Sequence, residues 1–126
     1  MEQSVVCDLL MAERTTTMAR IGAMTAEFEE IVTATAGSNT DDEHDPEGST
    51  IAFERAQVSA LLLEARAYLD DLDRALAKLD TGLYGICERC GSTIAPERLA
   101  ARPATHSCVS CAAITQRDAS DLSGRR

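Results

Sequence analysis

The hydrophobic positions in residues 50–80 recur at alternating intervals of four and three residues. They are Val58, Leu62, Ala65, Leu69, Leu72, Leu76 and Leu79. This spacing predicts a helix with an apolar seam that packs along a second helix. The stretch contains neither Gly nor Pro, and its length corresponds to about 46 Å of helix. We expect Ser49 or Thr50 to cap its start and Gly82 to end it in the left-handed conformation.

The charged side chains of this stretch lie off the seam, and we expect them to form a solvated face. Among them are Glu54, Arg55, Glu64, Arg66, Asp70, Asp71, Arg74 and Lys78. Residues 51–56, at the start of the stretch, are interpreted as packing within the helix pair and not as a contact surface.

The N-terminal segment repeats the same spacing over a similar length. Its positions are Cys7, Leu10, Arg14, Thr17, Ile21, Met24, Phe28 and Ile31. Arg14 and Thr17 make this seam the weaker of the two. The simplest partner of each helix is the other one, in an antiparallel hairpin over residues 1–80. Pairing between two chains is the alternative, but the matching lengths and the single connection favour the hairpin and therefore a monomer.

Residues 37–49 form the predicted connection at the tip of the hairpin. They contain Gly37, Pro46 and Gly48, five acidic residues, and neither Lys nor Arg. The length of the connection suits an extended loop between antiparallel helices. Acidic loops are commonly only solvated, so a function for this tip needs support from elsewhere in the chain.

The composition narrows both the fold and the class of function. Hydrophobic residues make up 44% of the 126 residues but aromatic residues only 3%, and twenty residues are alanine. Small side chains bury little area, which favours thin helices over a large core. The net charge of −9 disfavours a general nucleic-acid binder. No apolar run reaches the roughly 18 residues of a membrane span, and the acidic N-terminus is unlike a secretory signal. We therefore expect a cytoplasmic protein.

Four of the five cysteines form two C-x-x-C pairs, Cys87 with Cys90 and Cys108 with Cys111. Each pair can direct two thiolates to one centre, and two pairs complete a tetrahedral Zn²⁺ site. Gly91 permits the tight turn that follows the first pair. Four cysteines leave no open coordination position, so we expect one structural zinc ion. Few large apolar residues surround the pairs, and the metal is expected to supply most of the folding free energy there.

Other interpretations of the cysteines are weaker. Two disulfides do not fit a reducing compartment, and four unrelated thiols would not be expected at the spacing of a zinc site. A redox C-x-x-C lacks the surrounding βαβ pattern. His106 could replace Cys108 as a ligand, but four cysteines already satisfy the metal. We place the zinc-finger head at residues 81–113 and a short C-terminal helix, frayed from Asp118, at residues 114–126.

The sequence around the cysteines resembles the DksA/TraR C4-type zinc-finger family. The matching residues are Gly82, Leu83, Tyr84, Gly85, Ile86, Cys87, Cys90, Gly91, Ile94, Arg98, Leu99, Ala101, Pro103, Cys108 and Cys111. The resemblance implies an all-α fold with a helical hairpin before the finger. It also implies a regulator that binds bacterial RNA polymerase without sequence-specific DNA contacts. Members insert the hairpin tip through the secondary channel, while the zinc head and the C-terminal helix rest on the channel rim.

Carried over to this chain, the resemblance assigns partner binding to acidic tip residues and to arginines of the head. These are Asp42, Asp45, Glu47, Arg98 and Arg102. The family tip has two aspartates three residues apart and an alanine two residues later. Asp45 matches the first aspartate, but Gly48 and Thr50 occupy the other two positions.

Relatives that respond to ppGpp use three basic positions, and this chain keeps one of them. Arg102 matches, whereas Asp71 and Ala112 stand at the other two positions. We therefore expect little response to ppGpp.

Two functions from other classes remain open. The chain could be a zinc-stabilised coiled-coil adaptor for another protein, with the acidic tip as its recognition element. It could also be a redox sensor in which oxidation of the thiolates releases zinc. An enzyme is disfavoured, because the sequence has no nucleophile–base constellation, no glycine-rich phosphate loop and no open metal site.

Overall fold

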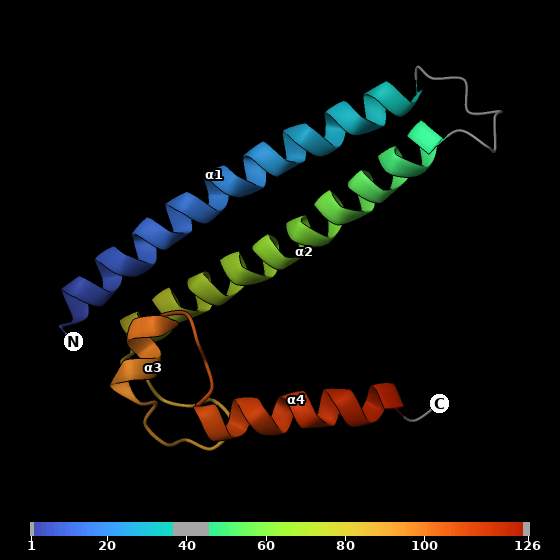
Figure 1. The fold of residues 1–126 in the computed structure, drawn as a ribbon. Helices are drawn as coiled ribbons and strands as arrows, with labels where there is room; N and C mark the ends of the chain where they lie inside the picture. Colours follow the sequence, from blue (N-terminus) through green and yellow to red (C-terminus); the bar gives the residue numbers. More distant parts are fainter. Residues whose placement is uncertain (1, 37–45, 125–126) are drawn as a thin grey trace. The chain divides into compact units, whose positions relative to one another are not determined.

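The computed structural model describes residues 2–36 and 46–124, with side chains for residues 2–34 and 49–116. These residues form four helices (Figure 1): α1 (Gln3–Ala36), α2 (Pro46–Thr81), α3 (Pro96–Ala101) and α4 (Val109–Gly124). The expected all-α class, with a long helical hairpin followed by a cysteine cluster, is confirmed. The chain divides into two compact units, one of residues 14–70 and the other of residues 1–13 and 71–126.

In the unit of residues 14–70, α1 and α2 pack against each other in antiparallel directions (Figure 1). Met24 of α1 is buried together with three residues of the predicted α2 seam, namely Val58, Leu62 and Ala65. Ile21, Phe28 and Ile31 pack against this cluster. The two seams predicted from the sequence therefore meet within one chain.

In the other unit, the first turns of α1 accompany the last turns of α2. Leu10 and Leu72 are fully buried, and Leu79 is 8% exposed. The Gln3 side-chain amide donates a hydrogen bond to the Leu79 carbonyl oxygen at 3.1 Å. Val6, which lies beside the predicted seam position Cys7, is the more deeply buried of the two, since Val6 is 2% exposed while Cys7 is half-buried.

Helix α2 begins at Pro46 and not at the predicted start, Thr50. The expected capping by Ser49 or Thr50 is therefore wrong, because both residues lie inside the helix. Proline suits the first turn of a helix, since its fixed φ is already helical and its missing N–H has no intrahelical acceptor. Residues 46–49, assigned to the tip loop, accordingly extend the helix.

The end of α2 follows the prediction. Gly82 has φ +77°, which favours glycine because a side chain is strained in this region. The Leu83 N–H donates to the Lys78 carbonyl at 2.9 Å, and the Gly82 N–H donates to the Leu79 carbonyl at 3.4 Å. This pair of bonds is a Schellman motif, which satisfies carbonyls at the end of the helix.

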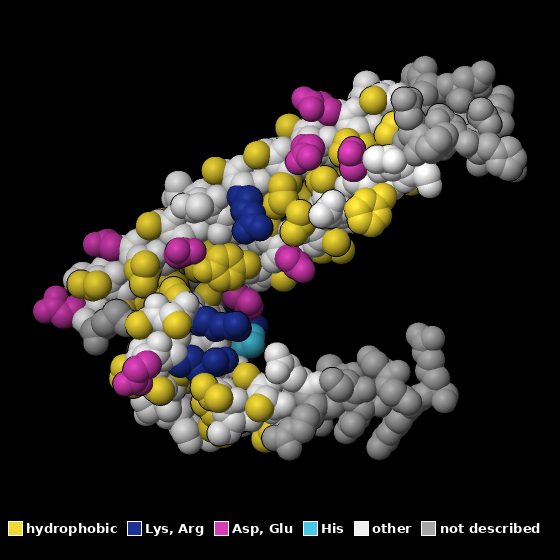
Figure 2. Space-filling model, in the orientation of Figure 1, with side chains coloured by type: hydrophobic (Ala, Val, Ile, Leu, Met, Phe, Trp, Pro, Cys, Tyr) yellow, Lys and Arg dark blue, Asp and Glu magenta, His cyan; other side chains and the backbone are white. Residues whose placement is uncertain are grey.

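The interpretation of residues 51–56 as hairpin packing is wrong for most of them. Phe53 is 69% exposed because it lies on the side of α2 that faces away from the α1 seam. A second series with heptad spacing occupies this side, and all its members are exposed. We call it the outer row; it comprises Phe53, Ala56, Ala60, Leu63 and Ala67. Figure 2 shows hydrophobic side chains on the surface of this unit.

The C-terminal region departs from the prediction in two ways. Helix α3 was not expected; it starts with Pro96 and buries Leu99. Helix α4 begins at Val109, between the cysteines of the second pair, and continues to Gly124. It is therefore longer at both ends than the expected short helix, and its backbone does not fray at Asp118. The Ala112 N–H donates to the Cys108 carbonyl at 2.9 Å, which closes the first turn.

None of the helices in the described part of the chain combines the length and the hydrophobicity that crossing a membrane would require.

Candidate metal centre

The first cysteine pair lies in a small antiparallel turn. Ile86 and Thr93 form a β-bridge. Inside it, the Cys87 N–H donates to the Ser92 carbonyl at 2.8 Å, and the Gly91 N–H donates back to the Cys87 carbonyl at 2.9 Å. Gly91 has φ +76°, so a residue with a side chain would strain this turn. The short turn brings Cys87 and Cys90 to the same side of the chain.

The second cysteine pair lies where the chain enters α4. Cys108 precedes the helix and Cys111 lies in its first turn. The segment before Cys108 is fixed to the first pair, because the Glu88 N–H donates to the His106 carbonyl at 2.9 Å. The two pairs, far apart in sequence, are thus held together by a backbone bond as well as by side-chain packing.

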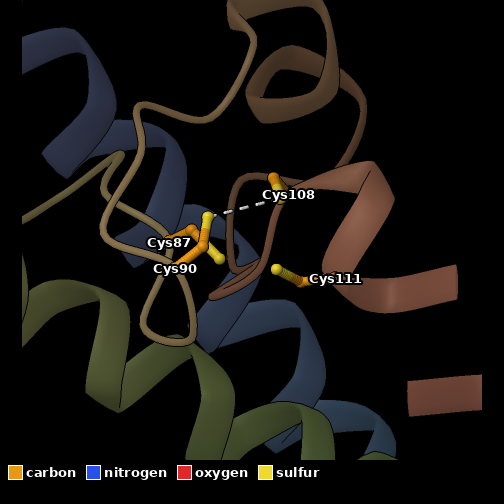
Figure 3. Close-up of side chains that lie close together, drawn as sticks. All are labelled: Cys87, Cys90, Cys108 and Cys111. Atoms are coloured by element: carbon orange, nitrogen blue, oxygen red, sulfur yellow. Dashed lines mark hydrogen bonds between the residues drawn. The ribbon is translucent and has the colours of Figure 1, made fainter. Parts of the chain in front are cut away.

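The four cysteine sulfur atoms all lie within 4.8 Å of one another (Figure 3). The Sγ atoms of Cys90 and Cys108 are 3.8 Å apart. A tetrahedron of sulfur atoms at 2.3 Å from a zinc ion has edges of about 3.8 Å, so the cluster fits this metal. A disulfide would need sulfur atoms about 2 Å apart, and the cysteines are free. His106 is not in the cluster; its Nε2 atom lies 3.9 Å from Asp71 Oδ1.

The charges within the cluster favour a bound cation. Backbone N–H groups of Cys90 and then Cys108 lower the pKa of the Cys87 thiol to about 6. The Ser92 side chain and N–H likewise lower the pKa of Cys90. The neighbouring Cys108 side chain and then burial raise the pKa of Cys111 to about 12. The site therefore stabilises some thiolates but resists ionising all four, and a divalent cation removes that conflict.

The hydrophobic core around this site is small. Its buried members are Cys87, Ile94, Leu99 and Cys111, with Tyr84 and Cys108 packed against them. The Tyr84 hydroxyl donates to the Pro103 carbonyl at 2.9 Å, which fixes the loop after α3. Half of the buried members are cysteines, so a bound metal would contribute a large share of the stability of the head.

The two residues between Cys87 and Cys90 contact different helices. Glu88 forms ion pairs with Lys78, at 2.5 Å, and with Arg74, both on α2. Arg89 donates through Nη1 to Thr115 Oγ1 of α4 at 3.0 Å. Figure 2 shows Lys and Arg side chains gathered beside the histidine of the head.

The sequence pattern did not predict this network and placed Lys78 on a solvated face. The structure corrects that assignment, because the Lys78 side chain is only 18% exposed. A signal was present in the sequence: Arg74 and Lys78 lie one helical turn apart, just before a cysteine pair that contains a glutamate.

The other predicted site residues have different surroundings. Arg98 is half-buried and bonded within the head, donating through Nε to the Ser107 carbonyl at 2.9 Å and through Nη2 to Thr105 Oγ1 at 3.3 Å. Arg102 is exposed at the end of α3. Asp42 and Asp45 lie outside the described residues. Glu47 belongs to the first turn of α2, but its side chain lies outside the described set.

Residues 82–117 match the model of the prokaryotic dksA/traR C4-type zinc finger, and the match includes all four clustered cysteines. The head matches the DksA/TraR zinc-finger family. The resemblance inferred from the sequence is thereby confirmed, and four clustered cysteines in a finger of this family support zinc as the metal.

Similarity to solved DksA structures extends beyond the DksA/TraR finger. The structure of transcription factor DksA2 from Pseudomonas aeruginosa matches with a TM-score of 0.72 and 25% identity, covering 92% of this chain and 84% of that one. This match includes the helical hairpin as well as the head.

Curated relatives match over shorter stretches. An uncharacterised protein of Aquifex aeolicus is 48% identical over 52 residues, which are 41% of this chain and 36% of that protein. The RNA polymerase-binding transcription factor DksA of Haemophilus influenzae is 35% identical over 51 residues, or 40% of this chain and 35% of that protein. The chain spans between 26% and 40% of the length of the curated relatives it matches.

Proposed function

We propose that this protein is a transcription regulator that binds bacterial RNA polymerase and inserts the tip of its helical hairpin into the secondary channel. The similarity to DksA2 over 92% of the chain is the observation that carries this proposal, because it joins the hairpin and the zinc finger in one architecture. A relative that matches over 51 residues is itself named an RNA polymerase-binding transcription factor. The proposed site of action is the cytoplasm.

In this proposal the acidic residues Asp42, Asp45 and Glu47 act near the catalytic centre of the polymerase. Carboxylate oxygens suit a centre that uses Mg²⁺. The tip needs no chemistry of its own, since binding one polymerase conformation more tightly than another shifts the balance between them. Arg102, exposed on the head, and Arg98, which its bonds to Ser107 and Thr105 hold in place, would meet an acidic rim.

One zinc ion, held by Cys87, Cys90, Cys108 and Cys111, keeps the head folded in this proposal. With four thiolate ligands the ion has no open position for substrate or water, so its contribution is structural. The regulator acts as a monomer, through protein contacts and without sequence-specific DNA binding. Three arginines in the finger are too few for tight binding to DNA at physiological salt.

The direct test is capture of core RNA polymerase by the tagged full-length protein, with a known secondary-channel binder as competitor. We expect stoichiometric binding that the competitor displaces. Binding that persists at saturating competitor would place the protein elsewhere on the polymerase and contradict channel insertion.

The role of the tip is tested by substituting Asp42, Asp45 and Glu47 together with alanine. We expect the transcriptional effect to be lost while polymerase binding is largely retained. The matched control replaces three exposed acidic residues of α1, Glu27, Glu29 and Glu30, which changes the net charge equally. Equal loss of effect in both variants would point to overall charge and not to the tip.

Little potentiation by ppGpp is proposed. Asp71, at a position where responsive relatives carry a base, is acidic and lies 4.0 Å from Arg74 and 3.9 Å from His106. The carboxylate of Asp71 would repel the phosphate groups of ppGpp. Strong potentiation of the transcriptional effect by ppGpp would contradict this view.

A second candidate function is that of an adaptor for a different protein. The outer row favours it, because exposed apolar residues with heptad spacing suit a partner helix. Copurification separates the two candidates: polymerase subunits should dominate if the protein is a polymerase regulator and should be absent if it serves another partner.

A further inference from the structure

Glu88 occupies a position that depends on both cysteine pairs. It lies between Cys87 and Cys90, so its backbone follows the turn that these two ligands form. Its N–H donates to the carbonyl of His106 at 2.9 Å. His106 lies two residues before Cys108, in the segment that carries the second cysteine pair. The position of Glu88 is therefore fixed both by the first cysteine pair and by the segment that leads into the second pair.

The Glu88 side chain points away from the cysteines to the last turns of α2. One carboxylate oxygen lies 2.5 Å from Lys78 Nζ, and the other pairs with Arg74. The exposed fractions are 18% for the Lys78 side chain, 36% for that of Glu88 and 50% for that of Arg74. Partial shielding of this kind makes the pairs stronger than fully solvated ones.

Lys78 also lies in the last turn of α2. Its carbonyl accepts the Leu83 N–H in the bond that closes the helix, while its ammonium group binds Glu88. A cation in the last turn is stabilised further by the helix dipole. The Glu88–Lys78 ion pair thus connects the metal site to the last turn of α2, after which the chain enters the head.

We propose that Glu88 is a positioning residue that couples metal binding at the four cysteines to the last turns of α2. With the metal bound, both cysteine pairs are fixed and hold Glu88 against Lys78 and Arg74. Without the metal, the cysteine pairs separate, and Glu88 loses this position. Linkage makes the effect reciprocal: the ion pairs strengthen metal binding, and the metal protects the end of α2.

Hydrogen exchange of the full-length protein, zinc-loaded and zinc-free, tests the coupling. Glu88→Gln keeps the shape of the side chain but removes its charge. In the zinc-loaded form we expect amides of residues 74–82 to exchange about fivefold faster in this variant, as two partly exposed ion pairs imply. In the zinc-free form the variant and the wild type should exchange equally. Equal acceleration in both forms, or none in either, would overturn the proposal.

The matched control is Glu97→Gln, which makes the same change at an exposed position of α3 in the same head. We expect it to follow the wild type in both forms. If Glu97→Gln accelerated exchange at residues 74–82 as much as Glu88→Gln does, any loss of charge in the head would have this effect. The positioning role proposed for Glu88 would then be wrong.

Zinc affinity gives a second readout, measured by competition with a chromogenic zinc chelator. Glu88→Gln and Lys78→Gln should each weaken zinc binding by roughly threefold to fivefold. The double variant should bind zinc no more weakly than Glu88→Gln alone, because that change already removes the ion pair that Lys78→Gln removes. Additive losses, unchanged affinities, or a wild-type chain that binds no zinc would refute the coupling. Neither measurement involves RNA polymerase, so the result is separate from that of the proposed function.

Discussion

The sulfur atoms of Cys90 and Cys108 lie 3.8 Å apart although 17 residues separate them in the sequence. That distance is too long for a disulfide and matches the edge of a zinc-centred tetrahedron. We predict one zinc ion per chain, measured by elemental analysis of the purified protein. Cys90→Ser should lose most of the metal, whereas Cys7→Ser, which changes the cysteine outside the cluster, should retain it. Full zinc content in Cys90→Ser would contradict the assignment of the four ligands.

Removing the metal should unfold the head while the helix pair of residues 14–70 remains folded. The unit of residues 14–70 has its own buried cluster, whereas structural zinc is typically worth about 10–16 kcal/mol to a small finger. After chelation we expect NMR signals of residues 82–117 to collapse to random-coil positions, with helical circular dichroism largely kept. Intact chemical-shift dispersion for the finger without metal would show that its apolar core suffices.

Two leucines of α2 differ strongly in how exposed their side chains are. Leu72 is fully buried and Leu63 is 66% exposed. Leu72→Ala should lower the free energy of unfolding by about 2–5 kcal/mol, because it leaves a cavity. Leu63→Ala, the same chemical change on the same helix, should cost under about 1 kcal/mol. Urea denaturation of both variants measures this difference, and similar costs would contradict the helix pairing described above.

Tyr84 makes the head sensitive to alkaline pH. Burial raises the pKa of its phenol above the ordinary value of 10.0. The folded state therefore holds this proton more tightly, so the associated stability is complete below about pH 10 and declines as the pH rises through the folded-state pKa. Absorbance titration of the phenolate in a Tyr68→Phe background, where Tyr84 is the remaining tyrosine, should give a midpoint above 10. A midpoint at or below that value would contradict the effect of burial.

Phe53 should matter for binding more than for stability. It is 69% exposed, so Phe53→Ala should change the melting temperature little. If the outer row contacts the polymerase, this variant should bind core polymerase at least about tenfold more weakly, in the range seen when an aromatic anchor is truncated. Phe28→Ala provides the comparison, because Phe28 packs against the buried cluster and its loss should destabilise the helix pair. Unchanged polymerase affinity in Phe53→Ala would exclude the outer row from the interface.

Periodicity predicted the helix pair well because the pairing depends on apolar positions that repeat along each helix. Val58, Leu62 and Ala65 are buried as the spacing indicates, and Gly82 ends α2 with a positive φ. The start of α2 was placed four residues late because the proline and glycine near it were interpreted as loop residues. Pro46 instead occupies the first turn, where the restrictions of proline cost nothing.

The cysteine spacing also predicted which thiols come together, since C-x-x-C pairs have few ways to converge. The contacts around the cluster could not be predicted from spacing. Glu88 pairs with Lys78 and Arg74 only because the turn after α2 brings the first cysteine pair back against that helix. A pattern read along the chain does not contain such a tertiary contact. For the same reason, the bond between Arg98 and the Ser107 carbonyl within the head could not be predicted.

Cys111 lies in the first turn of α4, so zinc bound at the four cysteines would anchor this helix to the head. A newly made chain would then have to bind zinc before its C-terminal third folds, and until then this third would be open to proteolysis. The amount of finished protein would then follow zinc supply in the cell even where its messenger RNA level stays constant.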